Sequence, residues 1–308
     1  MKDFSALAAK AVSESNIDMT KAQVGGGEDF APPPAGPCGL RLVGYFEIGK
    51  HAGTYLGKPT NKEYVQLVFE VLGKNYPAVE LPDGTKMPIR VTVEETFSLS
   101  DKGRFFALCQ RLLYAGDQQH VVGCMGRAYK GRIIHRKYAK RGEPKDDPSK
   151  HTGIAVELYD RKLKTWTIEA PRYEVVDQET GEATGEFKAV VVPPALTAPK
   201  AFLWNHSDKE DWDSLFIEGE YPERKNEKGE VTAPAKSKNV IQNKIRSATN
   251  FKTSPIYGIL AAAGVDLNAA LDPTDAPEDD DHSAPPAEQP APANMTPAQE
   301  DDALNGVV

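Results

Sequence analysis

Residues 40–48 read LRLVGYFEI and residues 63–72 read EYVQLVFEVL. In both stretches apolar residues occupy nearly every second position, and the positions between them are mixed in character. A period of two is typical of β-strands, because successive side chains point to opposite faces of a sheet. The apolar faces would hold Leu40, Leu42, Phe46 and Ile48 in the first stretch and Val65, Leu67, Phe69 and Val71 in the second. The pattern predicts two strands that turn one face toward a core, with Tyr45 and Tyr64 on the opposite face.

The next elements continue this pattern along the chain. We expect a strand at 89–99, a helix at 101–114 capped by Ser100, and strands at 120–129 and 152–159. Strand, strand, strand, helix, strand, strand is the order of an OB-fold, a five-stranded barrel that binds oligonucleotides with one strand face and two loops. The corresponding loops are 49–62 and about 130–151. The predicted fold class is mainly β with α: an OB-type five-stranded barrel at 37–170.

The remaining chain divides into three further parts. Residues 1–36 contain GGG at 25–27 and PPP at 32–34, which predicts a flexible N-terminal leader. Residues 171–264 predict an α+β extension packed on the barrel, with strands at 173–176 and 187–192 and helices at 208–216, 238–248 and 255–263. Residues 265–308 hold seven prolines and almost no large apolar residues, so we expect a disordered acidic tail.

The acidic tail masks a slightly basic body. The whole chain has a formal charge of 37 − 45 = −8, and without the tail's eleven Asp or Glu it is 37 − 34 = +3. Residues 127–141, RAYKGRIIHRKYAKR, hold seven Lys or Arg, three aromatic or imidazole rings and no acid. A basic, aromatic patch and a separate acidic tail favour a nucleic-acid binder. An ordinary soluble protein with a disordered end is the alternative interpretation.

Membrane and secreted classes receive no support from the sequence. No apolar run approaches the ~20 residues that span a bilayer. The first residues lack the apolar stretch of a secretory signal. Cys38, Cys109 and Cys124 are odd in number and lack CxxC spacing, which suits a reducing compartment. These features predict a cytoplasmic protein with no membrane contact.

Signs of catalysis are also few. The chain has no phosphate-binding glycine loop and no GxSxG turn, so we expect neither an enzyme nor a cofactor. Residues 205–208 with Asp211 and Asp213 could be drawn as a metal site of a nuclease. Such residues more often cap and solvate a helix N-terminus, where carboxylates favour the helix dipole. We therefore predict no metal.

Candidate nucleic-acid contacts fall in the two loops and on the strand face between them. Lysine and arginine neutralise phosphates, and tyrosine rings offer faces on which bases stack. The first loop contributes Lys50, Tyr55, Lys58 and Lys62, and the face between the loops contributes Tyr45, Tyr64 and Arg90. The second loop and its strand contribute Arg127, Tyr129, Lys130, Arg132, Arg136, Lys137, Tyr138, Lys140 and Arg141. The alternatives are a solvated hairpin loop for the lysines, and packing against the second half of the chain for Tyr45 and Tyr64.

Several stretches resemble phage-encoded single-stranded-DNA-binding proteins of the OB-fold type. They are RLVGYFEIG, YLGKPTNKEYVQLVFEV and ETFSLSDKGRFFALCQRLL, and later FLWNHSDKEDWDSLFIEGEY and SKNVIQNKIRSA, which together cover roughly residues 40–250. The second loop departs from the family, because EPKDDPSKH at 143–151 is long and unusually charged.

The resemblance implies a protein of the host cell cytoplasm that coats single strands, without sequence preference, during phage DNA replication or recombination. Replication or recombination proteins would dock on the acidic tail, and self-association is a further expectation. A virion structural or assembly protein that uses the basic patch for protein contacts is the alternative function, and a metal-dependent nuclease is the third.

Overall fold

The structure, a computed structural model, describes residues 32–80, 84–140, 142–177, 179–225 and 231–267. Contacts between Cα atoms divide these residues into two units, one of 32–222 with 235–267 and one of 223–225 with 231–234. The smaller unit holds a two-stranded ribbon of β14 (Arg224–Lys225) and β15 (Val231–Ala233). Most of the predicted leader, the predicted tail from residue 268 and Arg141 lie outside the described residues.

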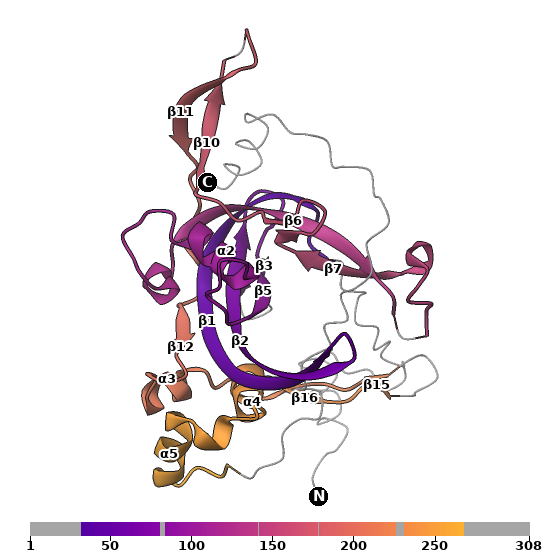
Figure 1. Cartoon of the computed structure of the whole chain (residues 1–308), viewed down its shortest axis with the longest axis vertical. Helices are drawn as coiled ribbons and strands as arrows, with labels where there is room; N and C mark the ends of the chain where they lie inside the picture. The colour runs from indigo at the N-terminus through magenta and orange to yellow at the C-terminus, as the bar shows by residue number, and fades with distance from the viewer. Residues whose placement is uncertain (1–31, 81–83, 141, 178, 226–230, 268–308) are drawn as a thin grey trace, which may run out of the picture. The chain divides into compact units, whose positions relative to one another are not determined.

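The larger unit is built on one sheet with the strand order β5-β2-β1-β6-β7 (Figure 1). Its strands are β1 (Gly36–Tyr55), β2 (Lys58–Leu72), β5 (Ile89–Thr96), β6 (Ala128–Tyr138) and β7 (Gly153–Glu157), and β12 (Lys200–Phe202) pairs with β1 in parallel. The other pairs are antiparallel. The prediction of a mainly β fold with helices is confirmed, but the sheet ends at β5 and β7 and is not closed into a barrel.

β1 and β2 form one long hairpin, so the predicted loop at 49–62 is wrong. Cross-strand pairing continues from Lys50 opposite Glu63 to Tyr55 opposite Lys58. Only Leu56 and Gly57 remain as the turn, with φ of 49° and 74°. Two-residue turns with positive φ at both positions match the twist of antiparallel strands. The basic residues of this segment therefore lie on paired strands.

Two irregularities in β1 move its side chains between the faces of the sheet. The pairing with β2 shifts between Leu42 and Gly44, and again between Glu47 and Gly49. A shift of one residue turns every following side chain to the other face. Glycine is required at 44, because a Cβ there would lie 2.7 Å from the ring of Phe46 and 2.9 Å from Val68. The alternation predicted over 40–48 therefore fails after Leu42.

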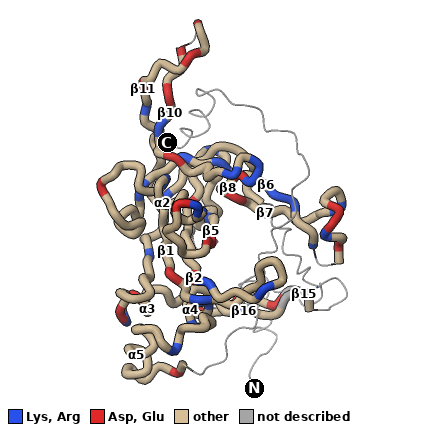
Figure 2. Tube along the Cα trace, viewed as in Figure 1, with Lys and Arg blue, Asp and Glu red and all other residues tan. Residues whose placement is uncertain are grey.

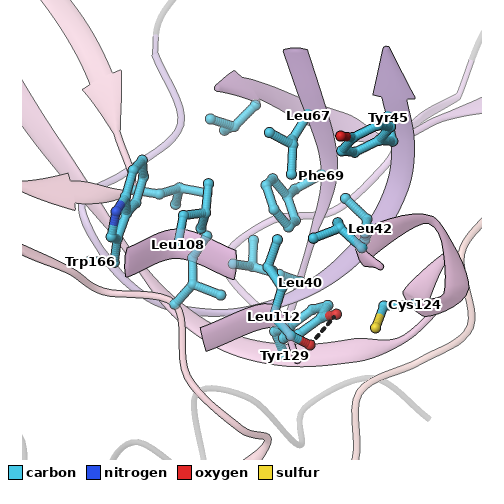
Figure 3. Close-up of a cluster of buried hydrophobic side chains, with 14 of the residues drawn as sticks. Leu40, Leu42, Tyr45, Leu67, Phe69, Leu108, Leu112, Cys124, Tyr129 and Trp166 are labelled. Carbon is cyan, nitrogen blue, oxygen red and sulfur yellow. Dashed lines mark hydrogen bonds between the residues drawn. The ribbon is translucent and has the colours of Figure 1, made fainter. Parts of the chain in front are cut away.

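Both faces of the sheet are covered. One face packs against α2 (Arg104–Leu112), and this cluster includes Leu40, Leu42, Leu67, Phe69, Leu108 and Trp166 (Figure 3). The other face packs against α3 (Lys209–Ser214), α4 (Val240–Arg246) and α5 (Pro255–Ala262), and this cluster includes Phe46, Ile48, Trp212, Ile245, Phe251 and Leu260. The predicted outward side of β2 consequently lies under the C-terminal half of the chain.

Short elements complete the larger unit. They are β3 (Val79–Glu80), β4 (Lys86–Met87), β8 (Tyr159–Asp160), β9 (Thr165–Trp166), β10 (Arg172–Val176), β11 (Ala183–Ala189), β13 (Glu220–Tyr221), β16 (Lys236–Ser237) and the 3₁₀ helices η1 (Val121–Cys124), η2 (Pro148–Lys150) and η3 (Phe251–Thr253). The predicted strand at 120–129 is wrong, because η1 occupies its first half and β6 begins at residue 128. The predicted cap is also wrong, because Gly103 stands at the N-cap of α2 without a side-chain hydrogen bond.

Candidate nucleic-acid interface

The end of the β1–β2 hairpin brings a tyrosine and two lysines together. Directly opposite residues share a face, so Tyr55 and Lys58 project to the same side, as do His51 and Lys62. Tyr55 is 61% exposed, and the Lys62 ammonium lies 5.3 Å from the centre of its ring. Lys58 is exposed and makes no ion pair among the described residues. The hairpin end can therefore offer positive charge and a ring to a ligand.

Lys50 lies nearer the base of the hairpin and is tied into the protein. Its ammonium is 3.5 Å from a carboxylate oxygen of Glu63, which offsets its charge. Its backbone N–H donates to Oδ1 of Asn250 over 2.8 Å, and its carbonyl accepts from the N–H of Thr249 over 2.7 Å. The C-terminal half thus anchors the hairpin at the point where it leaves the sheet.

Much of the basic run at 127–141 is strand β6, and acids partner three of its charges. Three ion pairs join Arg127 to Asp117 at 2.6 Å, Lys130 to Glu169 at 3.6 Å and Arg136 to Glu157 at 2.5 Å. The hydrogen bond from Arg127 holds the pKa of Asp117 below its usual value. Arg132 is half-buried opposite Pro37 of β1. This part of the run has less free charge than its composition predicts.

The far end of β6 is more open. Lys137, Tyr138 and Lys140 are exposed, and Lys137 makes no ion pair with any described residue. The following loop, 139–152, is closed by Glu143, whose carboxylate accepts from the N–H of Lys140 over 2.9 Å and from the N–H and hydroxyl of Thr152. Hydrogen bonding to Thr152 is the largest cause of the lowered pKa of Glu143. The ionised Glu143 carboxylate thus joins Lys140 to Thr152.

Tyr45 and Tyr129 belong to the core and not to a binding surface (Figure 3). Tyr45 is 1% exposed and packs edge-on against His120, and Tyr129 is fully buried with its hydroxyl donating to the carbonyl of Leu112 over 3.1 Å. Burial raises the pKa of both phenols. A base cannot stack on a ring that neighbouring side chains cover. The prediction that these two rings bind nucleic acid is therefore wrong.

The sheet face that was predicted to bind nucleic acid between the two loops is covered by the second half of the chain. Tyr64 is half-buried against the C-terminal cluster, with its ring centre 6.1 Å from that of His51, so the packing alternative holds for this residue. Arg90 is exposed, in a cross-strand row with Glu70 and Arg41. Glu70 is buried and accepts from the backbone N–H groups of residues 196 and 197, and Arg41 donates to the carbonyls of residues 192 and 193.

The residues considered as a metal site cap a helix. Asp208 is the N-cap of α3, and its side chain accepts from the N–H of Asp211 over 3.0 Å while the Asp211 carboxylate accepts from the N–H of Asp208 over 3.2 Å. Within the described ranges no three His, Cys, Asp or Glu side chains gather as a metal site would require. No helix in the same ranges has the length and apolar character needed to cross a membrane.

Sequence reasoning missed two features of the interface. The turn at Leu56-Gly57 lies inside the segment predicted as a loop, and Leu-Gly is not one of the residue pairs that signal a two-residue hairpin turn. Gly153 is not among the predicted contact residues, yet it lies directly opposite Tyr138. Neither strand's own sequence carries a signal for this pairing, because the two residues meet only through the register of β6 and β7.

Basic residues lie on the β1–β2 hairpin and along β6, and acidic residues lie around α3 and also in the loop between β6 and β7 and on the β10–β11 ribbon (Figure 2). Comparison with family models, curated proteins and solved structures gave no match to this chain.

Proposed function

We propose that this protein is a non-enzymatic, sequence-nonspecific binder of single-stranded DNA. The observation that carries the proposal is that two separate strand pairs each end in an exposed tyrosine beside a lysine without an ion pair among the described residues. These are Tyr55 with Lys58 at the hairpin end and Tyr138 with Lys137 at the end of β6.

This combination suits a strand with unpaired bases. Ammonium groups that neutralise phosphates release counterions and give affinity without reading sequence. A tyrosine face accepts any base, because every base has a π-face. Base pairing hides those faces inside a duplex, so the tyrosines favour single strands. Among the candidate residues, the other exposed cations, Lys62, Lys140 and Arg90, would add phosphate contacts.

The topology supports an OB-type domain. The strand order β5-β2-β1-β6-β7, with α2 between β5 and β6, agrees with a partly open five-stranded barrel of this type. Its two binding loops would correspond to the β1–β2 hairpin end and the 139–152 loop. In this proposal the strand face between them contributes less than the two ends, because the C-terminal half covers it.

The resemblance to phage single-strand binders gives the proposal its biological setting. The protein would coat single strands during phage DNA replication or recombination in the host cytoplasm. Proteins of that machinery would bind its acidic tail, and copies would associate along one strand.

A titration across salt tests the function. A labelled single-stranded oligonucleotide should bind the full chain with an affinity that falls steeply as salt rises and changes little with sequence. The matched duplex should bind less tightly at ~0.15 M salt. Equal affinity for both forms at that salt would contradict the proposal.

Point variants separate the two kinds of contact. Tyr55→Ala should weaken binding by ~1–3 kcal/mol, since it removes a stacking face. Lys58→Ala should lower the salt slope by about one unit. Lys252→Ala removes another exposed lysine, in η3 and outside both strand pairs, and should change neither quantity. A loss of the same size in the control would mean that general charge, and not the strand ends, binds the oligonucleotide.

A further inference from the structure

We infer that the ring of Tyr138 and the backbone of Gly153 together form a shelf for one unpaired base, with Gly153 as the residue that positions the ring. The inference rests on the proposed function and names a binding subsite within it. Its ligand is an unpaired nucleobase, whose flat face would lie on the open side of the tyrosine.

The geometry of the pair places the ring on the strand. Tyr138 and Gly153 are direct partners at the end of the β6–β7 ribbon. A Cβ built on Gly153 would lie 2.6 Å from Cε2 and Cζ of the tyrosine ring and 2.8 Å from Cδ2. Real Cβ atoms do not approach other atoms so closely. The ring therefore occupies the space that any other side chain at 153 would fill, and it buries the glycine while remaining 41% exposed itself.

The backbone does not require glycine at 153. Its φ lies outside the positive region that L-residues avoid, unlike that of the turn glycine Gly57. Alanine at 153 would fit the strand, and the three atoms nearest to its Cβ would all belong to the tyrosine ring. Substitution therefore tests the position of the ring, with little effect expected from backbone strain.

The ring of Tyr138 differs from the other exposed tyrosines in having no cation over it. Lys62, Arg127 and Lys238 each place a cation 5.3–5.8 Å from the ring of Tyr55, Tyr114 and Tyr221, respectively. Among the described residues, no cation and no second aromatic ring lies against Tyr138. One side of the ring is supported by strand β7 and the other is available to a base.

The surroundings favour a nucleotide as the ligand. Lys140 follows the tyrosine by two positions and is exposed, so a phosphate next to a stacked base would meet its ammonium group. Lys137 is also exposed, on the opposite face of the strand. Arg136, on the same face as Tyr138, is turned to Glu157 at 2.5 Å, and Arg161 reaches the same carboxylate at 3.3 Å.

A double-mutant cycle with a labelled single-stranded oligonucleotide tests the shelf. Tyr138→Ala should lower affinity roughly 5- to 150-fold, and Tyr138→Phe should retain most of it, because the stacking face remains. Gly153→Ala should lower affinity in the same direction when Tyr138 is present. In the Tyr138→Ala background it should cause no further loss, because no ring is left to displace.

Controls and a second measurement complete the experiment. The substitution Tyr221→Ala removes another exposed strand tyrosine, which lies beside Glu220. This variant should bind the oligonucleotide as tightly as the parent protein. Circular dichroism and thermal unfolding establish that each variant is folded. Ultraviolet crosslinking of an oligonucleotide with 5-iodouracil, followed by mass spectrometry, should attach the base to Tyr138 in the parent protein, even if Gly153→Ala fails to fold.

The outcomes are distinct. Two results with a parent protein that binds the oligonucleotide overturn the shelf and leave the proposed function standing. One is that Tyr138→Ala binds as tightly as the parent protein. The other is that Gly153→Ala lowers the affinity equally in both backgrounds. Crosslinking that avoids Tyr138 in a binding-competent protein also overturns it. Absence of binding by the parent protein overturns both proposals.

Discussion

At the scale of single residues, His51 shows how burial constrains an ionisable group beside the candidate interface. The imidazole is 3% exposed, its Nε2 lies 3.0 Å from the carbonyl of Ile48, and its ring meets Tyr64 edge-on. Burial is the main cause of its lowered pKa, and Lys244 of α4 lowers it further, while Glu94 of β5 acts in the opposite direction. The folded protein therefore holds His51 in its neutral form.

This burial predicts a loss of stability in mild acid. Because the folded pKa is lowered, the unfolded chain takes up the proton first, so the free energy of unfolding is fully retained above about pH 6.5 and falls as the pH drops toward the folded pKa. His51→Gln should reduce this dependence, and His206→Gln, at an exposed site, should not. Urea unfolding between pH 7.5 and 5 measures the effect. An unchanged pH dependence in His51→Gln would contradict it.

The same scale explains which site residues the sequence could identify. Composition located the basic and aromatic segments, and Tyr55, Lys58, Lys137 and Tyr138 are exposed as predicted. It could not separate Tyr55 from Tyr45, because that difference depends on a bulge next to Gly44 that turns Tyr45 into the core. Local alternation contains no signal for a bulge other than the glycine itself.

At the scale of elements, the turn of the β1–β2 hairpin combines a favourable geometry with an unfavourable residue. Leu56 has a φ of 49° and is 78% exposed, so it takes a left-handed conformation without packing that would offset the cost. Most L-residues lose roughly 1–2 kcal/mol in this region, whereas Asn and Gly tolerate it. The hairpin therefore forms against the preference of its first turn residue.

Replacing that residue should stabilise the hairpin. Leu56→Asn should raise the free energy of unfolding by about 0.5–1 kcal/mol, because asparagine adopts the left-handed region more readily. Leu56→Val should lower it, since a β-branched side chain is more strained there. Urea unfolding of the two variants measures both effects. A lower stability for Leu56→Asn than for Leu56→Val would show that the turn has a different conformation in solution.

At the scale of the whole chain, the arrangement of the C-terminal half could not be predicted from the sequence. The predicted helices at 208–216, 238–248 and 255–263 are present in shortened form, and each contributes residues to the C-terminal cluster. The sequence does not indicate which strands and which face of the sheet these helices cover. One edge of β1 is met successively by β6, β12 and residues 249–250, and these contacts join segments up to 200 positions apart. Such pairings are set by tertiary packing and leave no periodic pattern.

The acidic tail remains a prediction from the sequence, and the structure indicates at which residue a truncation of the tail should begin. Val265 still donates to the carbonyl of Leu260 at the end of α5, and Leu267 packs on the C-terminal cluster. Residues 268–308, outside the described part, carry ten Asp or Glu and no Lys or Arg. Tethered to the same molecule, these charges would compete with DNA phosphates for the exposed lysines at high effective concentration.

Removing residues 268–308 should therefore tighten DNA binding. The cut leaves Leu267 in place, so the C-terminal cluster stays intact, whereas an earlier cut would remove a packing residue as well. The gain in affinity should be largest at low salt and shrink toward zero as salt screens the tail. A full-length variant with the ten acids changed to Asn or Gln serves as the control, because it keeps the length of the tail while removing its charge. Both proteins should bind a labelled single strand more tightly than the parent by the same factor. If truncation and parent bind alike at low salt, the tail does not compete for the lysines, and only its role toward partner proteins is left to test.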